Sequence, residues 1–222
     1  MPTLFLTGST GALGSAIRSH YLNAGWSVAG FSYSDDSFTS KQYRFYAVDI
    51  TSESSTEEAF QKAASEMGVP DALVATVGGI RSWKPVAETS VDDFRALLDL
   101  NLVSFFVSAK QALKLMDKGG AIVSIGAESA LDPSARKGGY VASKAGVIAL
   151  TRVIAEEGKS SGITANCLVP TIIRSKGNEE WGNPDDFSKW TPPEDMAAMC
   201  FFLTSEPGKS VNGAVIRMPN RM

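Results

Sequence analysis

The chain has 222 residues, of which 44% are hydrophobic and 20% are charged, and its formal net charge is −3. This size suits one α/β domain with a large core, and the balance of charge offers no basic patch for nucleic acid or an anionic membrane. The sequence contains no apolar run long enough to cross a bilayer, so no membrane-spanning helix is expected. Residues 1–6 lead straight into a strand without a charged region or a cleavage site, so we expect a cytoplasmic protein.

Predicted strands and helices alternate along the chain. The strands fall at residues 3–7, 27–32, 44–48, 72–77, 121–125, 163–169 and 214–218, and the helices at residues 11–24, 53–67, 91–116, 139–158 and 191–203. Residues 34–41 are polar and irregular, and they are too few for a crossover helix. The alternation predicts an α/β fold: a doubly wound parallel sheet of about seven strands, with right-handed crossovers and helices on both faces.

Turn and capping residues mark the ends of several elements. Gly25 follows the first helix as a C-cap, and Thr191 precedes the last helix as an N-cap, with prolines in the first turn and Glu194 three residues on. The longest irregular stretch, residues 171–190, follows the carboxyl end of a strand. Ligands bind at that edge of such sheets, so we interpret this stretch as a substrate lid.

Histidine and cysteine usage excludes several chemistries. The only histidine is His20, expected on the surface of the first helix, so multi-histidine metal sites are excluded and a Ser-His-Asp relay has no well-placed base. The only cysteines, Cys167 and Cys200, fall in a predicted strand and a predicted helix, and both are expected to be buried and reduced. No metal site is predicted.

Tyr140 and Lys144 lie four residues apart in a predicted helix, in Tyr-Val-Ala-Ser-Lys. Positions i and i+4 share one face of a helix, so the phenol and the ammonium should be neighbours. A cation beside a phenol favours the phenolate and is expected to lower the pKa of Tyr140 from its usual value of about 10. Such a phenol can pass a proton to or from a carbonyl or alcohol oxygen. The alternative is a half-buried tyrosine beside a solvated lysine.

A glycine-rich turn, Thr7-Gly-Ser-Thr-Gly-Ala-Leu-Gly14, follows the first predicted strand and opens the first helix. Glycines let the backbone approach a pyrophosphate, and the helix N-terminus offers free N–H groups and the positive end of its dipole. The turn therefore predicts a dinucleotide site, which would supply a hydride. A tight turn without a ligand is the alternative.

The end of the second strand bears on the choice of cofactor. An NAD site often carries an acidic residue there, which binds the ribose 2′-hydroxyl. Ser32 falls at this place and could accommodate a 2′-phosphate, although the nearest cations, Lys41 and Arg44, do not stand beside it. Asp35 and Asp36 are close enough to serve NAD. NADP and NAD both stay open, with a mild preference for NADP.

With these motifs in place, the chain resembles the short-chain dehydrogenase/reductase family over essentially its whole length. Gly8 and Gly14 match the family's glycine motif, although Ala12 stands where a central glycine is usual and Gly11 precedes it. Residues 75–78 replace the usual Asn-Asn-Ala-Gly with Ala-Thr-Val-Gly. The resemblance implies a single NAD(P)-binding Rossmann domain over residues 1–222 and an oxidoreductase that moves hydride between nicotinamide and a carbonyl or an activated ring.

The resemblance also implies roles for particular residues. Tyr140 and Lys144 match the active-site motif, and Asn101 falls at the family's catalytic asparagine, although a buried structural asparagine is the alternative. Lys144 would hold the nicotinamide ribose, Tyr140 would donate the proton, and Asn101 would bind a water linking Lys144 to solvent. The cofactor would be bound by a set of residues at the sheet edge: Gly8, Thr10, Gly11, Leu13, Gly14, Ser32, Asp49, Ile50, Val77, Gly78, Lys144, Pro170 and Ile173.

The largest departure from the family is Ala127, which stands where most members carry a catalytic serine. A hydroxyl there is a second donor to the substrate oxygen, worth about 3 kcal/mol of transition-state stabilisation. Ser124 and Ser129 are near but out of register. The quinoid dihydropteridine reductases lack that serine, and residues 11–15, 77–79, 126–132 and 186–192 resemble theirs. Those enzymes reduce a quinonoid ring, an activated acceptor that would suit a site without the serine.

Two further expectations concern substrate and assembly. Aromatic side chains in loops either stack on a flat small-molecule substrate or pack the lid: Trp83, Trp181, Phe187 and Trp190. Loop arginines either bind an anionic group or stay solvated: Arg81, Arg136 and Arg174. The family resemblance implies a homo-oligomer, a dimer or a tetramer, formed through the helices at residues 91–116 and 139–158. A nucleotide-binding sensor with the same fold and no turnover is the rival function, motivated by Ala127 and the altered glycine turn.

Overall fold

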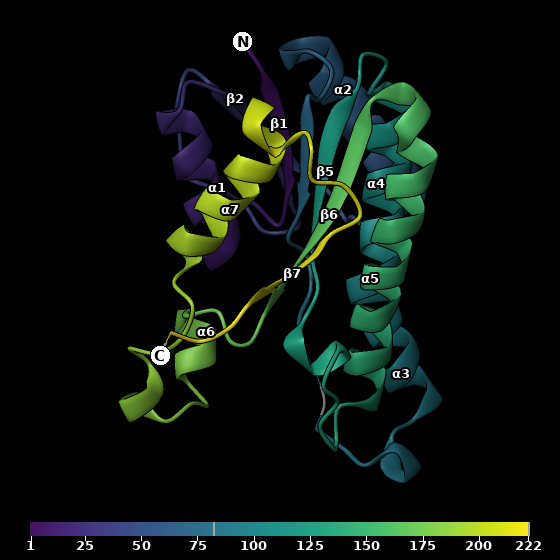
Figure 1. Cartoon of the computed structure of the whole chain (residues 1–222), viewed down its shortest axis with the longest axis vertical. Coiled ribbons are helices and arrows are strands. Elements are labelled where there is room, and N and C mark those ends of the chain that lie inside the picture. The colour runs from purple at the N-terminus through teal and green to yellow at the C-terminus, as the bar shows by residue number, and fades with distance from the viewer. Residues whose placement is uncertain (82, 222) are drawn as a thin grey trace.

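The computed structural model describes residues 1–81 and 83–221. Its sheet has seven parallel strands in the order β3-β2-β1-β4-β5-β6-β7. The strands are β1 (Thr3–Thr7), β2 (Ser27–Ser32), β3 (Tyr43–Ala47), β4 (Ala72–Ala75), β5 (Gly120–Ile125), β6 (Ile163–Pro170) and β7 (Val215–Met218). Their carboxyl ends point to the lower edge of the sheet in Figure 1. The doubly wound α/β prediction is confirmed.

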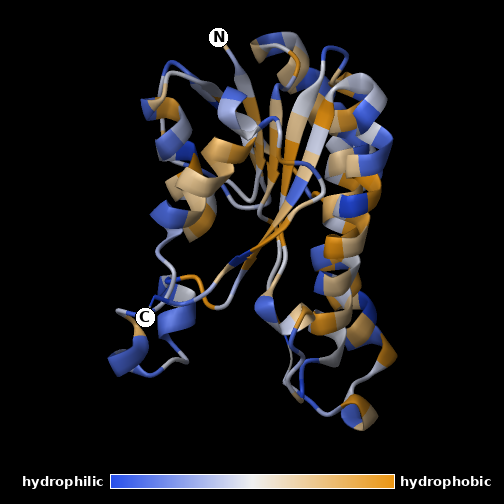
Figure 2. Cartoon of the chain, in the orientation of Figure 1, coloured by the Kyte–Doolittle hydropathy of each residue, from blue (hydrophilic) through white to orange (hydrophobic). Residues whose placement is uncertain are grey.

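Helices cover both faces of the sheet (Figure 1). On one face, α1 (Ala12–Asn23) packs against α7 (Pro193–Thr204). The other face carries three helices: α2 (Glu53–Met67), α4 (Ser104–Leu115) and α5 (Gly138–Glu157). The helix α3 (Val91–Leu98) packs against α5. Figure 2 shows apolar strands between these layers and polar residues on the outer surfaces of the helices.

The central strands are apolar on both sides because each side faces a core. In β1, Leu4 and Leu6 belong to the apolar cluster under α1 and α7, whereas Phe5 belongs to the cluster on the opposite face. Successive side chains of a strand point to opposite faces, so a strand buried on both sides has a continuous apolar run. Cys167 and Cys200 are buried free thiols in β6 and α7, as predicted.

The predicted helix at residues 91–116 is three consecutive elements: α3, a π-helical turn over Asp99–Val103, and α4. By length and composition alone Val91–Leu115 could span a membrane, but half of its apolar window is buried inside the fold, as in a core helix. The π turn contains Asn101, whose side chain is buried. Such turns often occur at functional sites, because they redirect one side chain from the regular helical positions.

Several boundaries differ from the predictions. Thr191 does not cap α7: its amide donates to the Ile172 carbonyl at 2.9 Å, and its hydroxyl lies 3.3 Å from the Met218 carbonyl oxygen, so Pro192 takes the cap position. The prediction of a Thr191 N-cap is therefore wrong, because the carbonyls of Met218 and Pro219, at the end of β7, take up this hydroxyl. The strand β4 ends at Ala75, two residues earlier than predicted, and residues 76–79 leave the sheet as a loop.

Candidate active site

A cleft of about 1330 Å³ lies at the carboxyl edge of the sheet. Its walls come from the glycine turn, the loops after β2, β4 and β5, the start of α5 and the 171–190 segment. The cleft brings together every residue predicted to bind the cofactor: Gly8, Thr10, Gly11, Leu13, Gly14, Ser32, Asp49, Ile50, Val77, Gly78, Lys144, Pro170 and Ile173. Tyr140 also lines it, whereas Asn101 is 1% exposed and lies behind the wall.

The glycine turn at Gly8–Gly14 depends on glycine at both ends. Gly8 has φ of 73°, and a Cβ there would come within 2.5 Å of Thr76 Oγ1. A Cβ on Gly14 would overlap the Gly8 carbonyl. Gly8 therefore allows the turn to lie against the loop after β4, and Gly14 allows the helix to start directly against the Gly8 carbonyl. Ala12 occurs at an exposed position.

The N-terminus of α1 is open toward the cleft. Its N-cap is Gly11, which has no side chain to accept from the first N–H groups, and the first turn contains no acidic residue. The first N–H groups of a helix lack intrahelical partners and favour an anion. A cradle of glycines below a free helix N-terminus, in a cleft of this volume, fits the pyrophosphate of a dinucleotide.

Two hydroxyls meet at the end of β2, and neither of the nearby carboxylates, Asp35 and Asp36, lines the cleft. Thr10 Oγ1 and Ser32 Oγ lie 2.7 Å apart on the cleft wall. Asp36 instead forms a buried ion pair with Arg18 and accepts a hydrogen bond from the Tyr43 hydroxyl at 2.6 Å. Burial tends to raise the pKa of Asp36, but the hydrogen bond from Tyr43 and the Arg18 charge lower it overall. Asp36 is therefore an occupied carboxylate outside the cleft lining.

Tyr140 and Lys144 lie one turn apart on α5, as their spacing predicts, but the effect on the phenol is opposite to the predicted one. Lys144 Nζ donates to the Ile125 carbonyl at 2.8 Å, and burial lowers the pKa of this lysine to about 8. Burial raises the pKa of Tyr140 to about 12. The predicted lowering of the Tyr140 pKa is therefore wrong, because loss of water around the phenol outweighs any effect of the cation. Tyr140 keeps its proton at neutral pH.

Asn101 is bound on three sides to backbone atoms. Its Oδ1 accepts from the Gly79 amide at 2.9 Å, and its Nδ2 donates to the carbonyls of Gly79 and Leu97, each at 3.0 Å. A Cβ on Gly78 would lie 2.7 Å from Asn101 Oδ1 and 2.8 Å from Lys144 Nζ. Gly78 thus allows the loop after β4 to pass between these two side chains, and Asn101 fixes that loop in place.

Comparison with known proteins gives the family. The family model described as Enoyl-(Acyl carrier protein) reductase matches residues 9–218. The chain is 29% identical to D-threitol dehydrogenase of Mycolicibacterium smegmatis over 94% of its own length and 88% of the relative's. It is 24% identical to dihydropteridine reductase of Dictyostelium discoideum, over 98% of this chain and 94% of that one. The structure of ElxO with NADP bound superposes with a TM-score of 0.91 at 25% identity, covering 98% of this chain and 97% of ElxO.

The chain belongs to the short-chain dehydrogenase/reductase family. It is accordingly an NAD(P)-dependent oxidoreductase. A short-chain dehydrogenase/reductase of Mycobacterium ulcerans has the same fold, with a TM-score of 0.90 over 99% of this chain and 90% of its own. The predicted family and reaction class are therefore confirmed.

The surroundings of Ala127 differ from the usual pattern of this short-chain dehydrogenase/reductase family. Ala127 is 5% exposed and lines the cleft. Ser124 is fully buried and shares a hydrogen bond with Thr151 Oγ1 at 2.7 Å, so its hydroxyl is occupied inside the fold. Ser129 lines the cleft, and beside it Glu128 pairs with Arg217 of β7. The hydroxyl missing at position 127 is not replaced by Ser124.

The 171–190 segment contains two short helices, α6 (Lys176–Glu179) and η5 (Pro184–Asp186). It lies below the sheet in Figure 1 and is largely hydrophilic in Figure 2. Trp190 is 3% exposed and packs against Phe187, with ring centroids 4.8 Å apart, whereas Trp181 is 53% exposed and lines the cleft. Trp190 thus packs inside the segment, whereas Trp181 forms part of the cleft wall.

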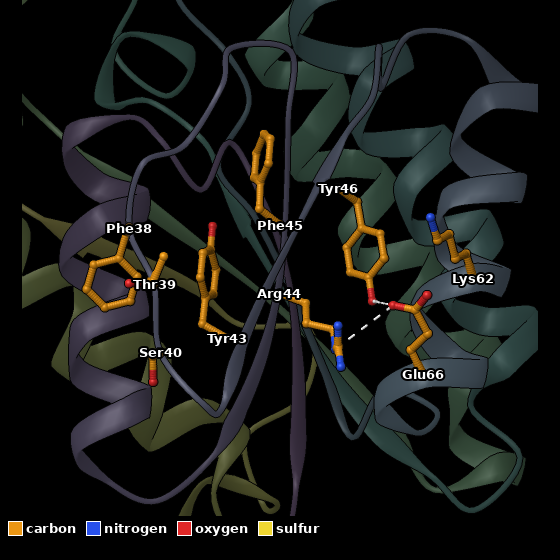
Figure 3. A pocket seen from close by; sticks show the side chains of 9 residues that line it. All are labelled: Phe38, Thr39, Ser40, Tyr43, Arg44, Phe45, Tyr46, Lys62 and Glu66. Atoms are coloured by element: carbon orange, nitrogen blue, oxygen red, sulfur yellow. Dashed lines mark hydrogen bonds and ion pairs between the residues drawn. The ribbon is translucent and has the colours of Figure 1, made fainter.

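A second hollow, of about 430 Å³, lies at the outer edge of the sheet beside β3 and α2 (Figure 3). There the Tyr46 hydroxyl donates to Glu66 Oε2 at 2.9 Å, and Arg44 lies 4.0 Å from the same carboxylate. None of its lining residues borders the larger cleft. Tyr46, Arg44 and Glu66 contact one another there, whereas the residues of the family motifs line the larger cleft. The described residues contain no cluster of three or more potential metal ligands.

Several contacts at the site were not predicted from sequence. Lys144 binds the Ile125 carbonyl, 19 positions away, and Asn101 binds the Gly79 backbone, 22 positions away. Asp36 binds Arg18, which lies 18 positions away. Backbone atoms carry no sequence signal. Nothing in the sequence marks Arg18 as a buried cation, and its partner Asp36 follows only from the fold.

Proposed function

We propose that this oxidoreductase reduces an activated planar ring, with Tyr140 as the proton donor and Lys144 as the cation beside it. The observation that carries the proposal is the combination of Tyr140, which lines the cleft one helical turn from Lys144, with Ala127 at the place of a second hydroxyl donor. A quinonoid ring gains aromatic or conjugative stabilisation on reduction and depends less on a second donor than a plain ketone does. Similarity to the dihydropteridine reductase of Dictyostelium discoideum supports the same substrate class.

The cleft residues divide the work as follows. The glycine turn and the α1 N-terminus would hold the pyrophosphate, and Pro170 and Ile173 on the cleft wall would contact the nicotinamide. When bound, the cofactor supplies the hydride. Tyr140 donates its proton to the substrate heteroatom, and the ammonium of Lys144 stabilises the phenolate that remains. Asn101 is a positioning residue, because it holds the loop at Gly79 against Lys144.

NADPH is the cofactor that this site favours. The cleft at the end of β2 offers the hydroxyls of Thr10 and Ser32, and the nearby carboxylate of Asp36 is already paired with Arg18. A carboxylate facing the ribose would repel a 2′-phosphate, and the described cleft residues at the end of β2, Ser32 and Tyr33, carry none. Similarity to ElxO with NADP bound supports the same preference.

The 171–190 segment serves as the substrate lid of a single domain over residues 1–222. The protein works in the cytoplasm without a nucleic-acid or membrane partner, and it associates as a homodimer or tetramer. Exposed apolar residues on the outer helices support self-association: Val91, Phe94, Phe106 and Val153. Light scattering that gives a mass near 23.6 kDa would contradict the oligomer.

The first experiment titrates the purified protein with NADPH and NADH while nicotinamide fluorescence is followed, and then adds quinonoid dihydropterin to the tighter complex. Oxidation of NADPH that falls by roughly 10²–10⁴-fold in Tyr140→Phe supports the ring reductase, because that is the usual contribution of a general acid. Tight binding with turnover of ketones alone contradicts the ring substrate.

A nucleotide-binding sensor is the rival function, favoured by the buried Ala127 at the position of a catalytic hydroxyl. The sensor needs no proton donor, so Tyr140→Phe should leave it unchanged in every assay. Binding of NADPH without oxidation in the presence of quinones, ketones and acyl thioesters would support the sensor over the reductase.

A further inference from the structure

Two tryptophans join opposite walls of the cleft. Trp83, in the loop after β4, and Trp181, in the 171–190 segment, both line the cleft, with ring centroids 6.0 Å apart. They are 45% and 53% exposed. Aromatic side chains that meet in a cleft are typical of ligand sites, where a bound molecule covers their apolar surface.

Trp181 differs from the neighbouring aromatic residues in its freedom to contact a ligand. Trp190 is 3% exposed, and its indole fills the space beside Gly182, where a Cβ would overlap it. Trp181 lies against Trp190, with ring centroids 5.7 Å apart. The buried indole therefore supports Trp181 from within the segment, and Trp181 keeps half of its surface for the cleft.

Trp83 is fixed by two cationic residues from the loop before α5. Lys137 Nζ lies over the Trp83 ring, 4.5 Å from its centroid, and Arg136 Nε donates to the Trp83 carbonyl at 3.1 Å. Arg136 has φ of 67°, a left-handed conformation that is uncommon outside glycine. Such a conformation persists where the surroundings enforce it, often at a binding site. The backbone and the ring of Trp83 are thus both held in place.

We propose that Trp83 and Trp181 form the substrate subsite, and that it takes a planar conjugated ring by stacking. This inference rests on the proposed ring reductase and adds the residues that select the ring. Paired aromatic rings have centroids about 4.5–7 Å apart, so the two indoles now contact each other directly. A ring held between them needs two such contacts, or about 9 Å between the indoles. Trp83 stays fixed, and Trp181 moves outward as the substrate ring replaces the contact between the tryptophans.

The test compares Trp181→Ala with Trp181→Phe, and uses Phe202→Ala as the matched control. Phe202 is 42% exposed on α7 and does not border the cleft. Each protein, saturated with NADP⁺ so that no reduction occurs, is titrated with fully oxidised pterin, a planar probe, and binding is read by calorimetry. The Kd for pterin is expected to rise about tenfold in Trp181→Ala and less than threefold in Trp181→Phe, because a stacked pair is worth about one factor of ten.

The same proteins are then assayed with quinonoid dihydropterin and with a saturated cyclic ketone. In Trp181→Ala, KM for the dihydropterin rises about tenfold while kcat and the constants for the saturated ketone change less than twofold. A purely structural role for Trp181 would instead alter both substrates alike, and would also weaken NADPH binding.

The outcomes separate the subsite from the proposed reaction. Pterin binding that depends on Trp181, without reduction of dihydropterin, supports the subsite and contradicts the ring reductase. Reduction of dihydropterin with equal KM in all variants contradicts the subsite and leaves the reductase intact. A wild-type protein that binds no pterin overturns the subsite.

Discussion

The inner and outer parts of the cleft hold their side chains in different ways. At the inner part, Lys144 is 5% exposed and Asn101 is 1% exposed, and each has a backbone partner within 3.0 Å. At the outer part, Trp83 and Trp181 are about half exposed and contact chiefly other aromatic or cationic side chains. Burial at the inner part fixes the groups that handle the proton, whereas exposure at the outer part leaves Trp181 free to move against a fixed Trp83 as the substrate binds.

The largest effect expected from this difference follows Gly78→Ala. The new Cβ would lie within 2.8 Å of both Asn101 Oδ1 and Lys144 Nζ, so the loop or the lysine must shift. A displacement of about 1 Å at a reacting group costs roughly a hundredfold in rate, and we expect that loss in kcat. Steady-state kinetics with NADPH and the ring substrate measure it.

Gly177→Ala is the matched control for this change. A Cβ at Gly177 meets no atom within 4 Å, so its kcat should equal that of the wild type. Equal kcat in Gly78→Ala and Gly177→Ala would mean that the inner part of the cleft tolerates a shift of the loop or of Lys144. The contrast between the inner and outer parts would then fail.

The burial of Lys144 predicts a pH-dependent stability. Because burial lowers its pKa from 10.5 to about 8, the folded protein binds fewer protons than the unfolded chain between these values. The free energy of unfolding should therefore rise with pH across that window, by about 3 kcal/mol relative to Lys144→Met, and the difference should be complete above pH 10.5. Urea unfolding of both proteins at several pH values measures the difference, and parallel curves would show that Lys144 is hydrated.

Ala127→Ser tests whether the inner part of the cleft is specialised for the reduction of an activated ring. Ala127 is buried on the cleft wall, and a hydroxyl there would restore a second donor to the substrate oxygen. We expect kcat/KM for a plain ketone to rise about tenfold, part of the effect of a well-placed donor, and the value for the ring substrate to change less than twofold. An unchanged ketone value would contradict this reading of the site.

Gly182→Ala should produce the smallest change, and only at the outer part. Its Cβ would overlap the indole of Trp190, which would disturb the support under Trp181. We expect KM for the ring substrate to rise about threefold with kcat unchanged, because a stacked aromatic contact contributes about 1 kcal/mol and would be only partly lost. A loss of kcat comparable to that of Gly78→Ala would show that the two parts of the cleft are not independent.

The sequence predicted the elements of this fold well because its signals are local. Alternating apolar strands and amphipathic helices predict the layers, and the i, i+4 spacing correctly places Tyr140 and Lys144 on one face of α5. The glycine turn likewise leads to the cleft, because the positive φ at Gly8 and the close approach at Gly14 are properties of the residues themselves.

Errors arose where the outcome depends on burial or on a distant partner. The pKa of Tyr140 was predicted to fall, but nothing in Tyr-Val-Ala-Ser-Lys reveals how little water reaches the phenol. The sequence offers Asp36 as a ribose ligand, but in the fold its carboxylate is bound by Arg18 and Tyr43. Thr191 has every local feature of an N-cap, yet its hydroxyl faces the carbonyls at the end of β7. Each case involves neighbours brought together by the sheet.

The ion pair between Arg18 and Asp36 has a consequence for the order in which the molecule opens. Residues 33–42 connect β2 to the edge strand β3 without a helix, and Arg18 reaches from α1 to stack on Phe38, 4.0 Å from its ring centroid. The side chain of Arg18 thus holds the β2–β3 connection against α1, whereas other connections are held by a packed crossover helix. We therefore expect β3 to exchange its amide hydrogens first, through a local opening that exposes Ser32. The rest of the sheet should stay protected during this opening.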